Sequence, residues 1–457
     1  MCGIFKMYIK ECESSMPLMK RTTTSQAFVG TSFPYLKTGL AAVLMSPMAG
    51  MASPWLEASD PFLRSSLVLL SDSGQLSAPI NQYPLRWSAF ADDLVFLGRS
   101  NDHRAIANQE LSHSLNNAKL NRGNRRLGLL GSSRAATPHG YGQFNDDKKG
   151  LYTHYEQLNH DFSYRISAQY REYQGNTDVR WEDSYLAYNA GPWLWSIGDL
   201  DRWWGPGWQH NLTLGSYAKA APDVSVSYLG QHSSLGMWSI ESLVASPSNN
   251  QVDYHSATRF VAKPFKRVEY GLTYQMWLAA QDSASNDDQI TLDGKLTLPA
   301  IDDFYHSVYL EAASTAKNTE LGAWMLGWTG AFPVGDSSVR LILETQQTTA
   351  DHSKTPWSVG AYPSMTDGVS NTSYLLENSQ SIAVHWQRSN DHKLGASHQT
   401  STQNQTDYDL TQLTYRFPAL AGMVHFGASY QRSHNQQHQN ATNNSQTAIW
   451  SGYEFRF

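Results

Sequence analysis

The chain has 457 residues and a formal net charge of -6, and only 16% of its residues are charged. It contains 15 Trp, 24 Tyr and 16 Phe, yet its mean hydropathy is -0.47. A helical membrane protein needs runs of about 20 apolar residues, and this sequence has none. Nothing in its charge pattern suggests a nucleic-acid partner. Many aromatic residues in a polar chain indicate alternating strands with one face toward lipid and the other toward water.

The first 52 residues predict an export signal. Basic residues precede an uncharged stretch, 38–52, which ends in small residues. We expect the signal to be cleaved after Ala52. Translation starts either at Met1 or at Met19, and Met19 is considered because acidic residues are unusual ahead of a signal core. A membrane anchor is the alternative, but about 15 residues are short for a bilayer span.

Both cysteines, Cys2 and Cys12, lie in the segment that is expected to be removed. A mature chain without cysteine excludes disulfides, thiolate metal sites and cysteine nucleophiles, and we expect neither a cofactor nor a metal. Residues 1–52 hold five basic and two acidic residues, so the mature chain would carry a net charge of -9.

The segment after the signal has helical periodicity. Asp60 and the proline after it supply an N-cap and a first-turn residue, and Gly74 ends this first helix. A second helix is expected after Pro84 and a third from Asp102. Each is too short to span lipid, so residues 53–135 are predicted to form a small periplasmic helical bundle.

From about Gly150 onward the period changes to two. Apolar and polar residues alternate in 162–171, 409–417 and 423–432. A soluble sandwich alternates in the same way. However, segments of about ten residues match strands that cross a bilayer at a tilt better than the shorter strands of soluble sheets. Residues 136–457 are therefore predicted to form an outer-membrane β-barrel.

Sixteen to eighteen strands are expected in this barrel, and eighteen is favoured because bacterial single-chain barrels have even strand numbers. With eighteen, long connectors follow odd strands and tight turns follow even strands, which places long loops outside the cell and short turns in the periplasm. The long connectors are 279–288, 350–375 and 435–446. The last strand is aromatic and ends in Phe457, which resembles the signal read by the bacterial barrel-insertion machinery.

Charged residues at inward positions of the predicted strands are expected to satisfy one another in the lumen, although they would also suit the selectivity lining of a pore. They are Arg165, Arg171, Arg180, Glu182, Arg340 and Glu344.

The segment GDLDRWWGPGWQ, residues 198–209, is the most distinctive motif. A sugar packs its CH face on an aromatic ring and bonds its hydroxyls to charged groups, so this segment has the composition of a glycan-binding surface. The alternative is structural, with the two Trp side chains packing a loop or joining the interfacial aromatic belt. The candidate residues are Asp199, Asp201, Arg202, Trp203, Trp204, Gly205, Pro206 and Gly207.

The run DRWWGPG and the stretch LVLLSDSGQLSAPINQYPLRW, residues 67–87, resemble the Wzi-like capsule-assembly family of outer-membrane proteins. Together with the terminal Phe457, the resemblance extends from one end of the mature chain to the other. It implies an eighteen-stranded barrel with a small periplasmic helical bundle, acting as a surface lectin that holds exported polysaccharide. Because the glycan contacts of the family lie on variable loops, the resemblance transfers no contact residue.

The leading hypothesis is a non-enzymatic protein that binds extracellular polysaccharide and supports attachment of capsule or exopolysaccharide. Its other expected partners are outer-membrane lipid, including lipopolysaccharide, and the insertion machinery. A porin or substrate-specific channel is the alternative, because the same fold supports it. An enzyme is disfavoured because no Ser or His lies in a recognisable nucleophile turn. His434 and His438 lie in a polar loop, where no metal site is expected.

Overall fold

The computed structural model describes fourteen segments of the chain: 54–94, 103–120, 125–134, 140–143, 148–158, 161–173, 176–216, 220–247, 252–279, 287–315, 320–348, 377–403, 406–435 and 443–457. The expected export signal and its cleavage site, the connector 350–375 and His438 lie outside these residues.

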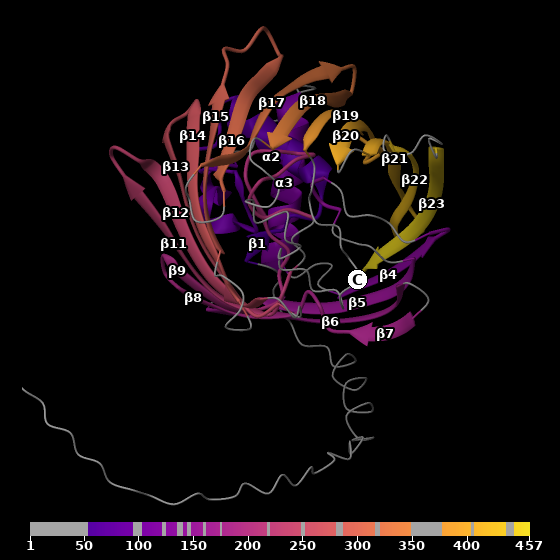
Figure 1. Cartoon of the computed structure of the whole chain (residues 1–457). Helices are drawn as coiled ribbons and strands as arrows, with labels where there is room; N and C mark the ends of the chain where they lie inside the picture. Colours follow the sequence, from indigo (N-terminus) through magenta and orange to yellow (C-terminus); the bar gives the residue numbers. More distant parts are fainter. Residues whose placement is uncertain are drawn as a thin grey trace, which may run out of the picture. The chain divides into compact units, whose positions relative to one another are not determined.

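Antiparallel strands form a closed barrel in which the last strand, β23, pairs with the first, β4 (Figure 1). The wall consists of β4 (Arg125–Ser132), β5 (Lys149–Leu158), β6 (Phe162–Tyr173), β7 (Asn176–Arg180), β8 (Tyr185–Ala190), β9 (Trp193–Gly198), β11 (Asp223–His232), β12 (Gly236–Ala245), β13 (Val252–Phe265), β14 (Val268–Ala279), β15 (Asp287–Thr297), β16 (Tyr305–Ser314), β17 (Leu321–Val334), β18 (Ser337–Thr348), β19 (Asn378–Arg388), β20 (Lys393–Gln403), β21 (Thr406–Ala419), β22 (Gly422–Asn435) and β23 (Asn443–Arg456).

Two of these segments, β7 and β8, form a single interrupted strand. The 169–173 part of β6 pairs with β7, and its 162–165 part pairs with β8. Asp183, between them, has a φ of 66°, in the left-handed region that breaks a regular strand. Among the described residues the wall therefore has eighteen strands, and the expected fold class is confirmed.

The barrel begins earlier than the expected boundary at residue 136. Strand β4 belongs to the wall, although it lies in the segment that helical periodicity assigned to the bundle. The two-residue alternation is hard to read here because Leu130 faces inward while Leu127 and Leu129 face outward, so apolar residues occupy both faces.

The N-terminal region contains two α-helices, α2 (Pro61–Asp72) and α3 (His103–Leu120). The Asp60 carboxylate caps α2 by accepting a hydrogen bond from the Phe62 amide at 2.9 Å, as its position in the sequence predicts. The expected second helix is wrong. Its place is taken by β2 (Gln82–Tyr83), β3 (Leu85–Arg86) and the short 3₁₀ turns η1 (Trp87–Ala89) and η2 (Ala91–Asp93). Strand β3 pairs with β1 (Trp55–Leu56). The segment after Pro84 therefore pairs with residues distant in the sequence and does not form the expected helix.

These elements lie inside the ring of strands and do not form a separate bundle beside it (Figure 1). We call the described residues of 54–120 the plug. Ion pairs and hydrogen bonds join the plug to the wall: Lys295 binds Asp72 at 2.7 Å, and the Arg340 side chain donates to the Ser65 hydroxyl at 2.8 Å. The apolar face of α2 is therefore buried within the barrel, where Leu67 and Leu70 have no exposed surface.

The outer surface of the barrel is apolar and carries a row of aromatic rings near one end. The ring centroids of Trp193 and Tyr228 are 4.7 Å apart. Those of Tyr228 and Trp238 are 5.3 Å apart, and those of Trp238 and Phe260 are 5.9 Å apart. Aromatic girdles of this kind mark the interfaces of membrane barrels. We call this the short-turn end, because the tight turns and Phe457 lie there, and the opposite end the long-loop end.

No helix in the described part of the chain is long and apolar enough to cross a membrane.

Candidate functional site

The DRWWGPG motif lies in the barrel interior. After β9 the chain turns inward, and we call residues 199–216 the inward loop. Its β10 (Trp203–Trp204) pairs with β2 of the plug. Trp203 and Trp208 are 1% exposed and Trp204 is fully buried. A sugar cannot stack on these rings unless the plug and the loop separate.

The Gly-Pro-Gly turn of the motif holds helix α2. The guanidinium of Arg64 donates to the carbonyl of Gly207 at 2.7 Å and to that of Pro206 at 3.0 Å. The same group lies over the rings of Tyr141 and Trp208, 4.3 and 4.4 Å from their centroids. Sequence reasoning missed Arg64, because a single arginine on a helix gives no sign that its partners are carbonyls about 140 residues away.

Gly205 supplies the backbone conformation that this turn requires. Its φ of 144° lies in a region that residues with a side chain rarely adopt. A Cβ atom at this position would also lie 3.1 Å from the Glu311 carboxylate. The first glycine of the motif is thus explained by the path of the backbone.

Arg202 of the motif is neutralised inside the protein. It donates to both carboxylate oxygens of Asp223, at 2.6 and 3.0 Å, and to Glu241 at 3.0 Å. Burial would lower the pKa of Arg202, but the two carboxylates outweigh it and raise the pKa. This guanidinium is committed to the wall and is not available to a glycan.

Of the eight candidate residues, Asp199 and Asp201 are half-buried and the other six are buried. Burial, followed by the charges of Asp201 and Glu182, raises the pKa of Asp199 to about 8. Asp199 is therefore largely protonated at neutral pH and can donate a hydrogen bond.

Carboxylates on the wall hold the inward loop and the plug through backbone amides. Glu344 accepts hydrogen bonds from the amides of Trp208, Gln209 and His210, at 2.5, 2.8 and 2.9 Å. Glu269 accepts two more from Ile80 and Asn81, both at 2.7 Å. Charge-assisted bonds of this kind are about twice as strong as neutral ones, so both insertions are fixed to the wall.

Ion pairs within the lumen account for four of the six inward charges that the sequence identifies. Arg165 contacts Glu156 at 2.8 Å, and Arg171 and Arg180 share Glu182, at 2.7 and 3.1 Å. The prediction that these charges satisfy one another is confirmed for Arg171, Arg180 and Glu182, whereas Arg165 pairs with Glu156, which was not among the six. Arg340 and Glu344 bind groups of the plug and the inward loop instead.

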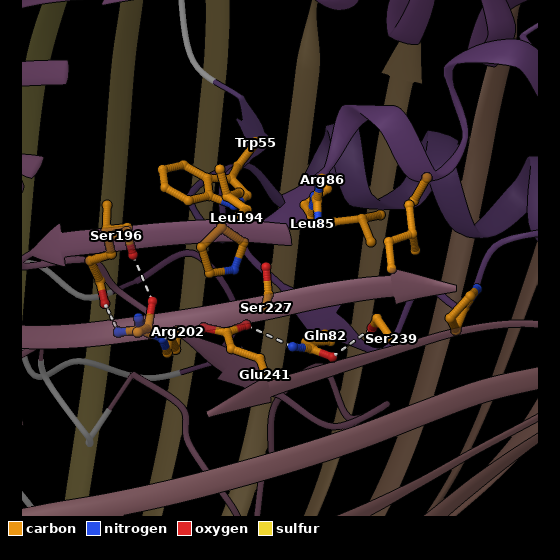
Figure 2. A pocket seen from close by; sticks show the side chains of 16 residues that line it. Trp55, Gln82, Leu85, Arg86, Leu194, Ser196, Arg202, Ser227, Ser239 and Glu241 are labelled. Carbon is orange, nitrogen blue, oxygen red and sulfur yellow. Dashed lines mark hydrogen bonds and ion pairs between the residues drawn. The ribbon is translucent and has the colours of Figure 1, made fainter. Parts of the chain in front are cut away.

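A narrow pocket lies between the plug and the wall (Figure 2). Gln82 of the plug donates to Glu241 at 2.7 Å and accepts from Ser239 at 3.2 Å, while Trp55 and Arg86 line another part. The cavity measures about 30 Å³, which is room for one or two water molecules. It is too small for a sugar ring.

Residues 118–279 match the family model of the capsule assembly protein Wzi. The resemblance to the Wzi-like family is confirmed. The matched segment contains the DRWWGPG run and the first part of the barrel, about a third of the chain, whereas the 67–87 stretch lies outside it. No curated protein matches the chain at a significant level.

Solved structures that resemble the chain include Wzi from Escherichia coli, described as a carbohydrate-binding β-barrel involved in group 1 capsule assembly. The two share 16% sequence identity with a TM-score of 0.72, over 88% of this chain and 99% of that one. At this identity the likeness to Wzi shows the fold. The outer membrane protein opdK from Pseudomonas aeruginosa also matches, at 9% identity and a TM-score of 0.44, over 73% of this chain and 98% of that one.

Proposed function

We propose that this protein is a non-enzymatic outer-membrane barrel that binds exported polysaccharide and supports its attachment at the cell surface. The Wzi family match and the shared fold support this proposal. The observation that carries it is the filled lumen. Arg64, Glu269 and Glu344 fix the plug and the inward loop inside the wall, an arrangement that suits holding a polymer at the surface better than passing solutes.

In this proposal the short-turn end faces the periplasm and the long-loop end faces outward, as in other bacterial barrels. The plug then occupies the periplasmic half, because its partners Lys295 and Lys393 lie near the short-turn ends of their strands. The aromatic girdle would contact outer-membrane lipid, including lipopolysaccharide, and the last strand would be read by the insertion machinery. The outer loops would contact the glycan, and the DRWWGPG run would join the plug to the wall.

A porin or substrate-specific channel is the second candidate function. Only the fold class favours it, because Arg340 and Glu344, which would suit the lining of a pore, are bound to the plug and to the inward loop. A channel would therefore require both insertions to move.

Deleting the gene and comparing cell-associated with shed polysaccharide tests the proposal. We expect the polymer to shift from the cells to the medium while the total amount stays the same, because attachment is lost and synthesis is not. Return of the wild-type gene should restore the cell-associated fraction. An unchanged partition would contradict an anchoring role, and a fall in the total amount would indicate a role in synthesis or export instead.

A further inference from the structure

Three inward arginines lie on the strands around the closure of the barrel. Arg126 on β4 lies directly opposite Arg456 on β23, and Arg416 lies on β21, two strands from β23 and level with Gly452. Arg126 faces the lumen because its neighbour Leu127, which is 40% exposed, faces outward. Directly opposed residues have Cβ atoms roughly 4.5–5.5 Å apart, and like charges in that arrangement destabilise a sheet.

Two histidines complete the cluster, which we call the arginine patch. His154 on β5 lies opposite Arg126, and His425 on β22 lies opposite Arg416. The Nε2 atoms of both histidines are buried and have no hydrogen-bond partner among the described residues. Each Nε2 can carry a proton and donate it to a bound ligand.

The charge of the patch is only partly balanced. Glu454 pairs with Arg456, and Asp60 lies 3.5 Å from Arg416. Within the described part of the chain, Arg126 forms no ion pair. Two inward cations elsewhere in the barrel have carboxylate partners: Arg259 contacts Asp293 at 2.7 Å, and Lys295 contacts Asp72 at the same distance. An added anion would relieve the repulsion at the patch.

The patch is also accessible. Arg126, His154 and His425 are half-buried, whereas Arg259 and Arg340 on the opposite wall have no exposed surface. Helix α2 packs against β16 and β19, and its N-terminal end reaches the patch, where Arg416 lies 3.5 Å from Asp60 and over the ring of Phe62.

We propose that the arginine patch binds an anionic group, a carboxylate or a phosphate, of the exported polysaccharide at the short-turn end, in addition to the proposed glycan contacts of the outer loops. A planar guanidinium matches two oxygens of such a group, and two opposed guanidiniums can hold it from both sides. This inference rests on the proposed function and deepens it, because it identifies the polysaccharide as acidic.

Calorimetry on the full chain in detergent micelles tests this inference. The probes are an oligogalacturonate, a neutral oligoglucose of the same length, and inorganic phosphate as competitor. We expect the uronate to bind at least about tenfold more tightly than the neutral sugar, and Arg126→Gln to remove about tenfold of that affinity. Added salt should weaken uronate binding, because it screens charges at an accessible site.

Two variants serve as controls. Arg126→Lys keeps the positive charge but loses the planar guanidinium that can bind two oxygens at once, so we expect its uronate affinity to lie between those of the wild type and Arg126→Gln. Arg388→Gln removes an exposed arginine at the same end, which contacts Asp336 at 3.2 Å, and should leave binding unchanged. Heat-modifiable migration on gels confirms folding, and Arg126→Gln should fold at least as well as wild type because it relieves repulsion with Arg456.

Equal affinity for the uronate and the neutral sugar, with no phosphate binding, would overturn the inference, and so would equal anion affinity in Arg126→Gln and Arg388→Gln. Phosphate binding without uronate binding, lost in Arg126→Gln, would support the patch with phosphate as its ligand. A negative binding result would not contradict the proposed anchoring role, which is tested separately by the polysaccharide partition in the deletion strain. Conversely, an unchanged polysaccharide partition together with intact anion binding would contradict the anchoring role and still support the anion-binding site.

Discussion

At the scale of single residues, Arg64 links the plug to the DRWWGPG motif. It donates to two buried carbonyls, at 2.7 and 3.0 Å. Hydrogen bonds with a charged partner contribute about 1.5–3 kcal/mol each. Arg64→Leu would remove both, although the Gly207 carbonyl would keep its hydrogen bond from the Trp203 indole at 2.9 Å. We expect this variant to lower the free energy of unfolding in detergent by about 3 kcal/mol.

Denaturant titration of Arg64→Leu beside Arg388→Leu measures this difference, because Arg388 is an exposed arginine at the end of β19. Its loss should change stability by less than about 1 kcal/mol. Equal stability of the two variants would show that the motif does not hold the plug.

Asp60 makes the stability of the plug depend on pH. Burial raises the pKa of its carboxyl group, but Lys393, Arg416 and the amides of Phe62 and Leu63 together lower it from 3.8 to about 2. Because the folded value is the lower one, Asp60 stabilises the protein above about pH 4, and this contribution of about 2 kcal/mol is lost as the pH falls toward 2.

Asp60→Asn keeps an N-cap but cannot ionise. Its free energy of unfolding should therefore fall less steeply than that of the wild type between about pH 4 and pH 2. Parallel curves for the two proteins over this interval would contradict the assigned role of Asp60.

At the scale of secondary structure, the sequence predicted elements whose signals are local. Asp60 and Gly74 mark the ends of α2, and two-residue alternation marks strands such as 162–171 and 423–432. The eighteen strands of the wall were predicted from the length of the strands and from the even strand number of bacterial barrels. This was possible because alternation and turn chemistry depend on neighbouring residues alone.

Elements that depend on distant partners were not predictable in the same way. The apolar residues Trp87 and Phe90 fit a helix by spacing, but Trp87 lies in a 3₁₀ turn and Phe90 lies between two such turns, beside strands that pair with other segments. The amphipathic face of α2 was visible, yet periodicity does not tell whether that face meets another helix or the inside of a wall. The candidate residues Trp203 and Trp204 were recognised as a motif, while their burial depends on the position of the plug.

At the scale of the whole molecule, the barrel encloses its own N-terminal segment and the inward loop. Wall carboxylates and arginines bind both insertions. Helix α2 packs against β16 and β19, whereas most inward residues along β4, β5 and β21 to β23 are half-buried. This asymmetry leaves the arginine patch partly exposed.

Conductance in planar bilayers tests most directly whether the filled lumen closes the barrel. The full chain should show no large steady openings, whereas a variant without residues 54–120, and with 201–220 replaced by a short Gly-Ser turn, should conduct because both insertions are gone. Large steady openings of the full chain would contradict the account and favour a channel.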